Sequence, residues 1–352
     1  MTTRSRFLQS AAGALGAGAL AGSPLGASAK PRALRDADVS KLYDEAKKEG
    51  TVVWWTGQYA QDAAERVRDA FKSKYPGIEV NFIRQTGQVL FQRLSQDLKS
   101  GVKELDVFAS TDEAHYPILK KQNALASFVP ADLDKIAPAY RTLDPDETYQ
   151  LGAYALMLFN YNPKKTGAPK KWADLLDPKY KSQLTVGHPG FSGFVGNWAL
   201  AMNDKYGWDN YFKKFAANEP KIGRSVFDAT NDIVGGERIV GPGADSLAGE
   251  RHASGSAIDI GFPQDDTIVV INPVAVMKDA PHPSAARLFM NFYYSREYSR
   301  ALLKSYVVPI RTDVPPAGNV HLDRLKLYRS KVDRLATGIP EVVAKWRETF
   351  GV

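Results

Sequence analysis

A glycine-rich segment, residues 187–196, combines residue types that can hold an anion. Three glycines surround Ser192, and an apolar helical pattern begins at Phe194. Backbone N–H groups at a helix N-terminus attract a carboxylate or a phosphate, so Ser192, Gly193 and Phe194 are candidate ligand contacts. The same serine is also a common N-cap, which leaves a purely structural role open. The segment lacks the G-x-S-x-G spacing of a hydrolase nucleophile.

A second set of residues with anion-binding chemistry follows later in the chain. Arg224 precedes Ser225, and a guanidinium can hold a carboxylate or phosphate through two parallel hydrogen bonds. Residues 240–246 read Val-Gly-Pro-Gly-Ala-Asp-Ser. Within this stretch, residues 241–245 are a predicted loop that offers backbone donors, at Gly243 among others, and one carboxylate at Asp245. A plain surface role for Arg224 stays open.

The elements that must position these residues begin with a predicted parallel sheet. Apolar or β-branched runs at 51–56, 78–83 and 105–109 alternate with helical patterns at 62–74 and 89–99. Strand–helix–strand units with such short joints are typical of parallel strands joined by right-handed crossovers. The fold class is therefore α/β.

Polar residues stand where these three strands end. In a parallel sheet, ligands bind at the carboxyl ends of the strands. The candidate contacts at those ends are Gln58, Tyr59, Thr86, Thr111 and Asp112. None of the three turns has the arrangement expected of a nucleotide-binding fold.

The rest of the chain continues the α/β pattern. A long apolar strand is expected at 154–161, and a second α/β unit begins with a strand at 184–186. The other expected elements are helices at 194–206 and 208–217, strands at 257–261 and 267–276, and helices at 282–294, 296–304 and 340–350. The glycine-rich segment thus lies between a strand and a helix of the second unit.

Residue combinations that resemble catalytic motifs are incomplete. Residues 112–115 read Asp-Glu-Ala-His, a helicase-like word, but no G-x-x-x-x-G-K-[ST] loop accompanies it. The chain has no cysteine, and its five histidines show neither triad nor metal-ligand spacing. We therefore expect a binding protein that is not an enzyme and that uses no cofactor and no metal ligands.

The first 29 residues have the composition of an export signal. Arg4 and Arg6 form a basic start, a weak apolar stretch follows, and residues 27–29 read Ala-Ser-Ala, a cleavage signature. The pair of arginines, which one residue separates, favours Tat over Sec export. No later run of roughly 18 apolar residues predicts a membrane span. Cleavage after Ala29 is expected to leave the mature protein in the periplasm.

The net charge of the mature chain argues against a nucleic-acid partner. Removal of residues 1–29 lowers the formal charge from +7 to +5. The remaining excess is spread along the chain in short clusters, such as the lysine pairs at 164–165 and 170–171. Such clusters are typical of solvated loops, so we expect no nucleic-acid face.

The order of these features resembles the extracellular solute-binding proteins of ABC importers, in the branch that contains the ferric-ion-binding proteins. The resemblance covers nearly all of the mature chain. It is carried by Thr-Val-Val-Trp-Trp-Thr-Gly-Gln-Tyr at 51–59, Leu-Asp-Val-Phe-Ala-Ser at 105–110, Trp-Ala-Asp-Leu at 172–175, Pro-Lys-Tyr at 178–180 and Asn-Pro-Val-Ala-Val at 272–276.

The resemblance implies a two-lobed periplasmic-binding-protein fold. Each lobe is then a mostly parallel sheet flanked by helices, and two hinge-crossing strands let the lobes close on a ligand. Placed on this chain, lobe one is built from 40–151 plus 272–352 and lobe two from 152–271, with the ligand cleft between them. The implied partners are a small-molecule ligand and the membrane permease of an ABC importer, and we expect a monomer.

The tyrosines decide between two kinds of cargo. The ferric relatives hold iron through phenolates, usually with an adjacent tyrosine pair in the second lobe. The corresponding stretch here, 240–246, has no tyrosine, and the pair Tyr293-Tyr294 falls in the other lobe. We therefore expect a small anionic solute that carries a carboxylate or phosphate. Ferric iron held by Tyr59, Tyr154 and exogenous anions is one alternative, and a secreted hydrolase is a less favoured one.

Overall fold

The fold is described by a computed structural model that covers residues 32–318 and 320–352. The predicted export signal and its cleavage site, residues 1–29, lie outside these described residues. Along the described part of the chain, no helix combines the length and the apolar character needed to cross a membrane.

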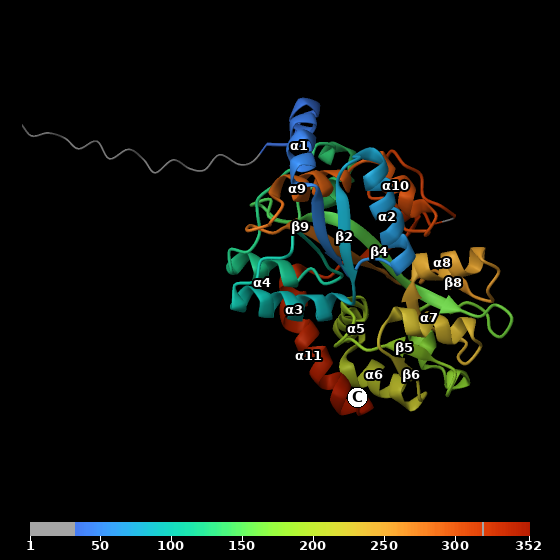
Figure 1. Cartoon of the computed structure of the whole chain (residues 1–352). Coiled ribbons are helices and arrows are strands. Elements are labelled where there is room, and N and C mark those ends of the chain that lie inside the picture. Colours follow the sequence, from blue (N-terminus) through green and yellow to red (C-terminus); the bar gives the residue numbers. More distant parts are fainter. Residues whose placement is uncertain (1–31, 319) are drawn as a thin grey trace, which may run out of the picture. The chain divides into compact units, whose positions relative to one another are not determined.

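The N-terminal part of the described chain forms three parallel strands with helices between them (Figure 1). The elements are α1 (Asp36–Glu49), β1 (Thr51–Thr56), α2 (Gln61–Lys74), β2 (Glu79–Arg84), α3 (Gly87–Ser100), β3 (Val107–Ala109) and α4 (His115–Lys121). β1 lies between β2 and β3 and pairs in parallel with both. The predicted alternation of strand and helix is confirmed.

Side-chain spacing explains why these helices form where they do. Ala63, Val67 and Phe71 recur at four-residue intervals in α2, and all three are buried, so one apolar face holds this helix against the sheet. Gly50 and Gly101 end α1 and α3 with φ of 73° and 71°. Glycine adopts this left-handed conformation without steric cost, which makes it a common helix stop.

Two long strands, β4 (Gln150–Tyr161) and β9 (Thr267–Val276), pair antiparallel in the middle of the main sheet. The strand order is β2-β1-β3-β9-β4-β7, with β7 at Val240–Ala244. β9 pairs with β3 near its C-terminal end, whereas the C-terminal part of β4 pairs with β7 and with β8 (Asp259–Gly261). These two strands therefore join the N-terminal strands to the later part of the chain (Figure 1).

The segment between the long strands adds a second group of elements. β5 (Thr185–Gly187) and β6 (Lys221–Gly223) form a separate parallel pair. The helices of this segment are α5 (Gly193–Tyr206), α6 (Trp208–Ala217), α7 (Val226–Val234) and α8 (Asp245–Ala253). After β9 come α9 (Pro283–Phe292), α10 (Arg296–Leu303), β10 (Leu327–Tyr328), which pairs with β9, and α11 (Val332–Phe350).

Each long strand contributes to two large apolar clusters. The first contains Trp54, Phe71, Phe289 and Tyr293, and the second contains Trp172, Trp198, Phe212 and Trp346. Neighbouring residues of β4 alternate between them, because Leu156 lies in the first cluster and Met157 in the second. Val269 and Val270 of β9 divide in the same way. Opposite faces of one strand pair thus support two cores.

The packing of the C-terminal helix affects where the proposed boundary between the lobes lies. Lobe one was expected to include all of residues 272–352. However, α11 packs against α5 and α6, and its residues Leu335, Ile339, Val342 and Trp346 belong to the second apolar cluster. We therefore propose that 332–350 belongs with lobe two and that the other predicted boundaries stand.

The predicted loop at 241–245 is wrong, because these residues belong to β7 and to the start of α8. The two glycines of the segment serve strand packing. A Cβ on Gly241 would lie 1.9 Å from the carbonyl oxygen of Thr185, and a Cβ on Gly243 would lie 1.8 Å from Oδ1 of Asn160. Glycine therefore lets β7 run close to its neighbours.

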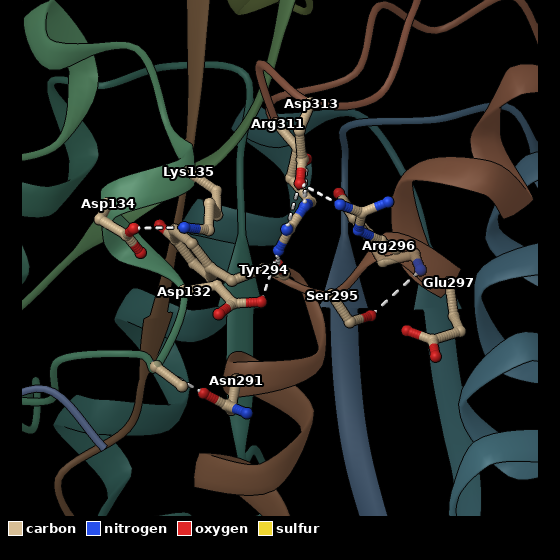
Figure 2. Close-up of polar contacts among 12 residues, drawn as sticks. Asp132, Asp134, Lys135, Asn291, Tyr294, Ser295, Arg296, Glu297, Arg311 and Asp313 are labelled. Atoms are coloured by element: carbon tan, nitrogen blue, oxygen red, sulfur yellow. Dashed lines mark hydrogen bonds and ion pairs between the residues drawn. The ribbon is translucent and has the colours of Figure 1, made fainter. Parts of the chain in front are cut away.

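A buried arginine ties the C-terminal part of the chain to the segment before β4 (Figure 2). The Arg311 side chain is 3% exposed and pairs with Asp313 (Nε to Oδ1, 2.8 Å) and Asp132 (Nη1 to Oδ2, 2.6 Å). It also donates to the carbonyl oxygen of Tyr294, 2.5 Å away. All of these partners belong to the protein, so the charge of Arg311 stabilises the fold.

We predict that Arg311→Met lowers the free energy of unfolding by roughly 2–3 kcal/mol, because it leaves a buried carbonyl without its donor and removes the cation that pairs with Asp132 and Asp313. Arg296→Met is the matched control, since Arg296 also pairs with Asp313 but its side chain is 54% exposed. Exposed pairs contribute less than about 1 kcal/mol. Urea denaturation measures both variants, and equal losses would contradict the structural role of Arg311.

Candidate functional site

A pocket at the carboxyl ends of the N-terminal strands collects many of the predicted contacts. Gly57, Gln58 and Tyr59 line it after β1, Arg84 lines it at the end of β2, and Thr111 lines it after β3. Residues from α5, α7, α8 and β4 form the other walls. The expectation that the strand ends meet at one site is therefore met by the geometry.

Five helices begin at the wall of this pocket. The N-cap residues of α2, α3, α5, α7 and α8 all line it, and they are Ala60, Thr86, Ser192, Ser225 and Ala244. A helix N-terminus carries a partial positive charge of roughly half an elementary charge. Convergence of five such ends on one pocket favours a bound anion.

Arg84 adds a full positive charge to the same wall. Its Nε donates to the carbonyl oxygen of Tyr59 at 2.7 Å, and its Cζ lies 4.3 Å from the centre of the Phe227 ring. No carboxylate within the described residues lies within 4.0 Å of this guanidinium. Burial lowers the pKa of Arg84, but a guanidinium remains protonated at neutral pH.

Arg84 was not among the ligand contacts predicted from the sequence. The predicted strand ended at residue 83, so Arg84 fell between a strand and the polar turn at 85–87. The signal was available, because Arg84 directly precedes that strand-end turn. In the structure it is the last residue of β2 and pairs with Thr56, the last residue of β1.

A free hydroxyl lies beside Arg84 in the pocket wall. Oγ1 of Thr86 is buried and has no hydrogen-bond partner within the described chain. The following residue, Gly87, approaches β3 closely, because an added Cβ would lie 2.7 Å from Oγ of Ser110 and 3.0 Å from Oγ1 of Thr111. The absence of a side chain at Gly87 thus allows the start of α3 to lie close to Thr111, and both threonines line the pocket.

Seven of the predicted ligand contacts line the pocket: Gln58, Tyr59, Thr86, Thr111, Ser192, Phe194 and Ser225. Four of their side chains already have protein partners, among them Tyr59, whose hydroxyl is hydrogen-bonded to that of Tyr298. Nε2 of Gln58 donates to the carbonyl oxygens of Asn272 (2.8 Å) and Pro273 (3.1 Å) in β9. Ser192 and Ser225 accept from backbone N–H groups of α5 and α7, as N-caps do. Contact between these residues and a ligand stays a prediction.

The other six predicted contacts are not in the pocket lining: Asp112, Tyr154, Gly193, Arg224, Gly243 and Asp245. One side chain, Gln88, occupies two of them. Its Oε1 accepts from the backbone N of Gly193 at 2.8 Å, and its Nε2 donates to Oδ2 of Asp112 at 3.2 Å. A protein amide therefore takes the helix N–H group that the sequence offered to an anion.

Arg224 and Tyr154 are also directed elsewhere. Arg224 is exposed and lines a different surface hollow, together with His188 and Phe191. The hydroxyl of Tyr154 is buried and donates to the carbonyl oxygen of Pro309 at 2.7 Å. Neither residue lines the pocket that contains Arg84.

The hydroxyl groups of Tyr59 and Tyr294 make hydrogen bonds within the protein. The hydroxyl of Tyr59 is bonded to that of Tyr298, which donates to the carbonyl oxygen of Gly152 at 2.7 Å. Tyr294 donates to the carbonyl oxygen of Leu151 at 2.7 Å. Burial raises the pKa of Tyr59 above its usual value, which disfavours the phenolate that iron(III) requires. Within the described ranges, no three His, Cys, Asp or Glu side chains are grouped to hold a metal ion.

Asp245 lies behind the pocket wall, between the pocket residues Ala244 and Ser246. It is 1% exposed, its Oδ1 accepts from the backbone N of Leu156 at 3.1 Å, and its Oδ2 has no partner within the described chain. Burial outweighs these backbone hydrogen bonds and raises the pKa of Asp245 to about 7.

We predict that Asp245 makes the protein less stable as the pH rises from about 4 to 7. In that range Asp245 loses its proton in the unfolded chain but keeps it in the folded chain. Above pH 7 both states are deprotonated, so stability stops falling. The asparagine of Asp245→Asn does not titrate, so its stability escapes this decrease. The free energy of unfolding of the variant relative to wild type should therefore rise by a few kcal/mol from pH 4 to pH 8. Urea midpoints at both pH values test this, and a pH-independent difference would contradict it.

Comparison with known proteins follows the geometry of the site. A family model described as bacterial extracellular solute-binding protein matches residues 54–299. A relative from Salmonella typhimurium, a putative 2-aminoethylphosphonate-binding periplasmic protein, is 23% identical over 299 residues, which are 80% of this chain and 85% of the relative. An uncharacterized protein from Haemophilus influenzae is 22% identical over 247 residues, 66% of this chain and 70% of that protein.

Solved structures share the fold at low sequence identity. The periplasmic binding protein AfuA from Actinobacillus pleuropneumoniae, with fructose-6-phosphate bound, has a TM-score of 0.77 at 19% identity and covers 86% of this chain and 99% of its own. Iron-bound HitA from Pseudomonas aeruginosa has a TM-score of 0.72 at 19% identity, over 85% of this chain and 99% of its own. The predicted two-lobed α/β fold is confirmed, and the chain belongs to the bacterial extracellular solute-binding protein family.

Proposed function

We propose that this protein is the substrate-binding component of an ABC importer and that it captures a small anionic solute in the pocket beside Arg84. The observation that carries the proposal is the convergence on the same wall of five helix N-termini and one guanidinium that has no carboxylate partner among the described residues. Both features attract negative charge, and a guanidinium forms strong paired hydrogen bonds with carboxylate or phosphate oxygens.

The relatives support a solute that carries a phosphonate or phosphate group. The Salmonella protein is named for a phosphonate, and AfuA holds a sugar phosphate. Members of the family are binding proteins. We therefore propose that the chain acts without catalysis, as a periplasmic monomer that delivers its solute to a membrane permease.

We predict that Arg84→Met weakens binding of the favoured anion by about 10- to 100-fold, because it removes charge-assisted hydrogen bonds. Isothermal titration calorimetry with 2-aminoethylphosphonate, fructose-6-phosphate and inorganic phosphate identifies the anion and measures the loss. Arg224→Met is the matched control and should bind as wild type, because Arg224 is exposed and outside the pocket lining. Equal binding by both variants would contradict the assignment of Arg84.

The iron alternative makes a different prediction. We expect no visible charge-transfer band when the protein is mixed with ferric iron and citrate, because Tyr59 and Tyr154 are buried and hydrogen-bonded to the protein. Visible absorption spectra of wild type and Tyr59→Phe test this expectation. A strong band in wild type that disappears in Tyr59→Phe would support ferric binding and contradict the preference for an organic anion.

A further inference from the structure

The pocket contains a carboxylate as well as a guanidinium. Glu250, in α8, lines the same pocket as Arg84. No ion pair within 4.0 Å joins the two side chains, which have separate sets of partners. Arg84 contacts Tyr59 and Phe227, whereas Glu250 faces Arg66 of α2. The wall of the pocket therefore presents charges of both signs at separate places.

The surroundings of Glu250 leave its negative charge incompletely neutralised. Arg66 pairs with Asp62 at 2.9 Å and with Glu250 at the longer distance of 3.4 Å, and it also donates to Ser305. Two carboxylates thus share one guanidinium. Burial and the neighbouring Asp62 raise the pKa of Glu250, although the contact with Arg66 acts in the opposite direction.

A purely anionic solute would leave this arrangement unsatisfied. Its negative group is attracted to the helix N-termini and Arg84 but gains nothing from Glu250, and any second negative group is repelled by it. A solute with an ammonium group would supply the missing cation. Ala60, Ala63, Leu247 and Val307 line the same pocket and are suited to a short hydrocarbon spacer.

We propose that the solute is a small zwitterion in which an ammonium group is separated by a short apolar spacer from a phosphonate, phosphate or carboxylate. The anionic group is held by the helix N-termini and Arg84, and the ammonium group by Glu250 and Ser305. This inference rests on the proposed function, because it assigns the second half of the same site.

The test uses matched pairs of compounds that differ in the ammonium group. The pairs are 2-aminoethylphosphonate with ethylphosphonate, phosphoethanolamine with ethyl phosphate, and β-alanine with propionate. Calorimetry on the full mature protein gives an affinity ratio for each pair. We expect at least one pair to bind, with the ammonium compound favoured by about tenfold or more.

Two variants locate the source of this preference. Glu250→Gln should reduce the affinity ratio toward one and leave the ammonium-free compound within about twofold of its wild-type affinity. Glu65→Gln is the matched control, because it removes a carboxylate of α2 that hydrogen-bonds to Gln61 and does not line the pocket. This variant should keep the preference. Melting temperatures of both variants show whether a change in binding reflects a change in folding.

The outcomes separate this inference from the proposed function. A ratio near one in wild type, or an unchanged ratio in Glu250→Gln, overturns the zwitterion. In either case, binding of an ammonium-free compound that is lost in Arg84→Met still supports the anion site. If no pair binds but inorganic phosphate or fructose-6-phosphate does, the zwitterion alone is overturned. If none of these compounds binds, the proposed anion site is overturned as well.

Discussion

The pairing of β4 with β9 is the constraint on which the rest of this structure depends. Both strands are almost entirely buried, and their successive side chains face two different apolar clusters. Because side chains of a strand alternate between its faces, one strand pair can support a core on either side. The strand ends that form the pocket wall and the helices that begin there are held in place by these cores. Loss of this pairing would therefore disconnect the halves of the binding site.

Polar side chains complete this strand pair where its register shifts between Leu151 and Ala153. Gly152 allows Gln58 to approach, since a Cβ there would lie 2.8 Å from Nε2 of that side chain. Tyrosine hydroxyls satisfy neighbouring carbonyl groups of the strands. A buried carbonyl without a donor costs free energy comparable to a lost hydrogen bond. Gln58, which resembles a ligand contact in the sequence, therefore helps to hold these strands in place.

The pocket combines two electrostatic features that arise from different levels of structure. Helix N-termini contribute partial charges that depend only on where each helix begins. Arg84 and Glu250 contribute full charges whose effect depends on burial and on partners. Under our proposal, the helix N-termini and Arg84 hold the anionic group, and Glu250 selects the ammonium group at the other end of the solute. Under the same proposal, the two charges orient the solute, and the apolar residues of the pocket contact its spacer.

The sequence by itself determined the α/β class, most element positions and the family, because local apolar periodicity and the order of motifs are both written along the chain. It also placed Thr86, Thr111 and Ser192 near the site, since strand ends and helix starts are local features. Only the tertiary structure decided that Gln88 occupies the α5 N-terminus, that β7 replaces a loop, and that Arg84 and Glu250 share one pocket. These facts depend on side chains that are distant in sequence and that compete for the same hydrogen bonds and the same space. A local sequence pattern does not predict which of them makes the contact.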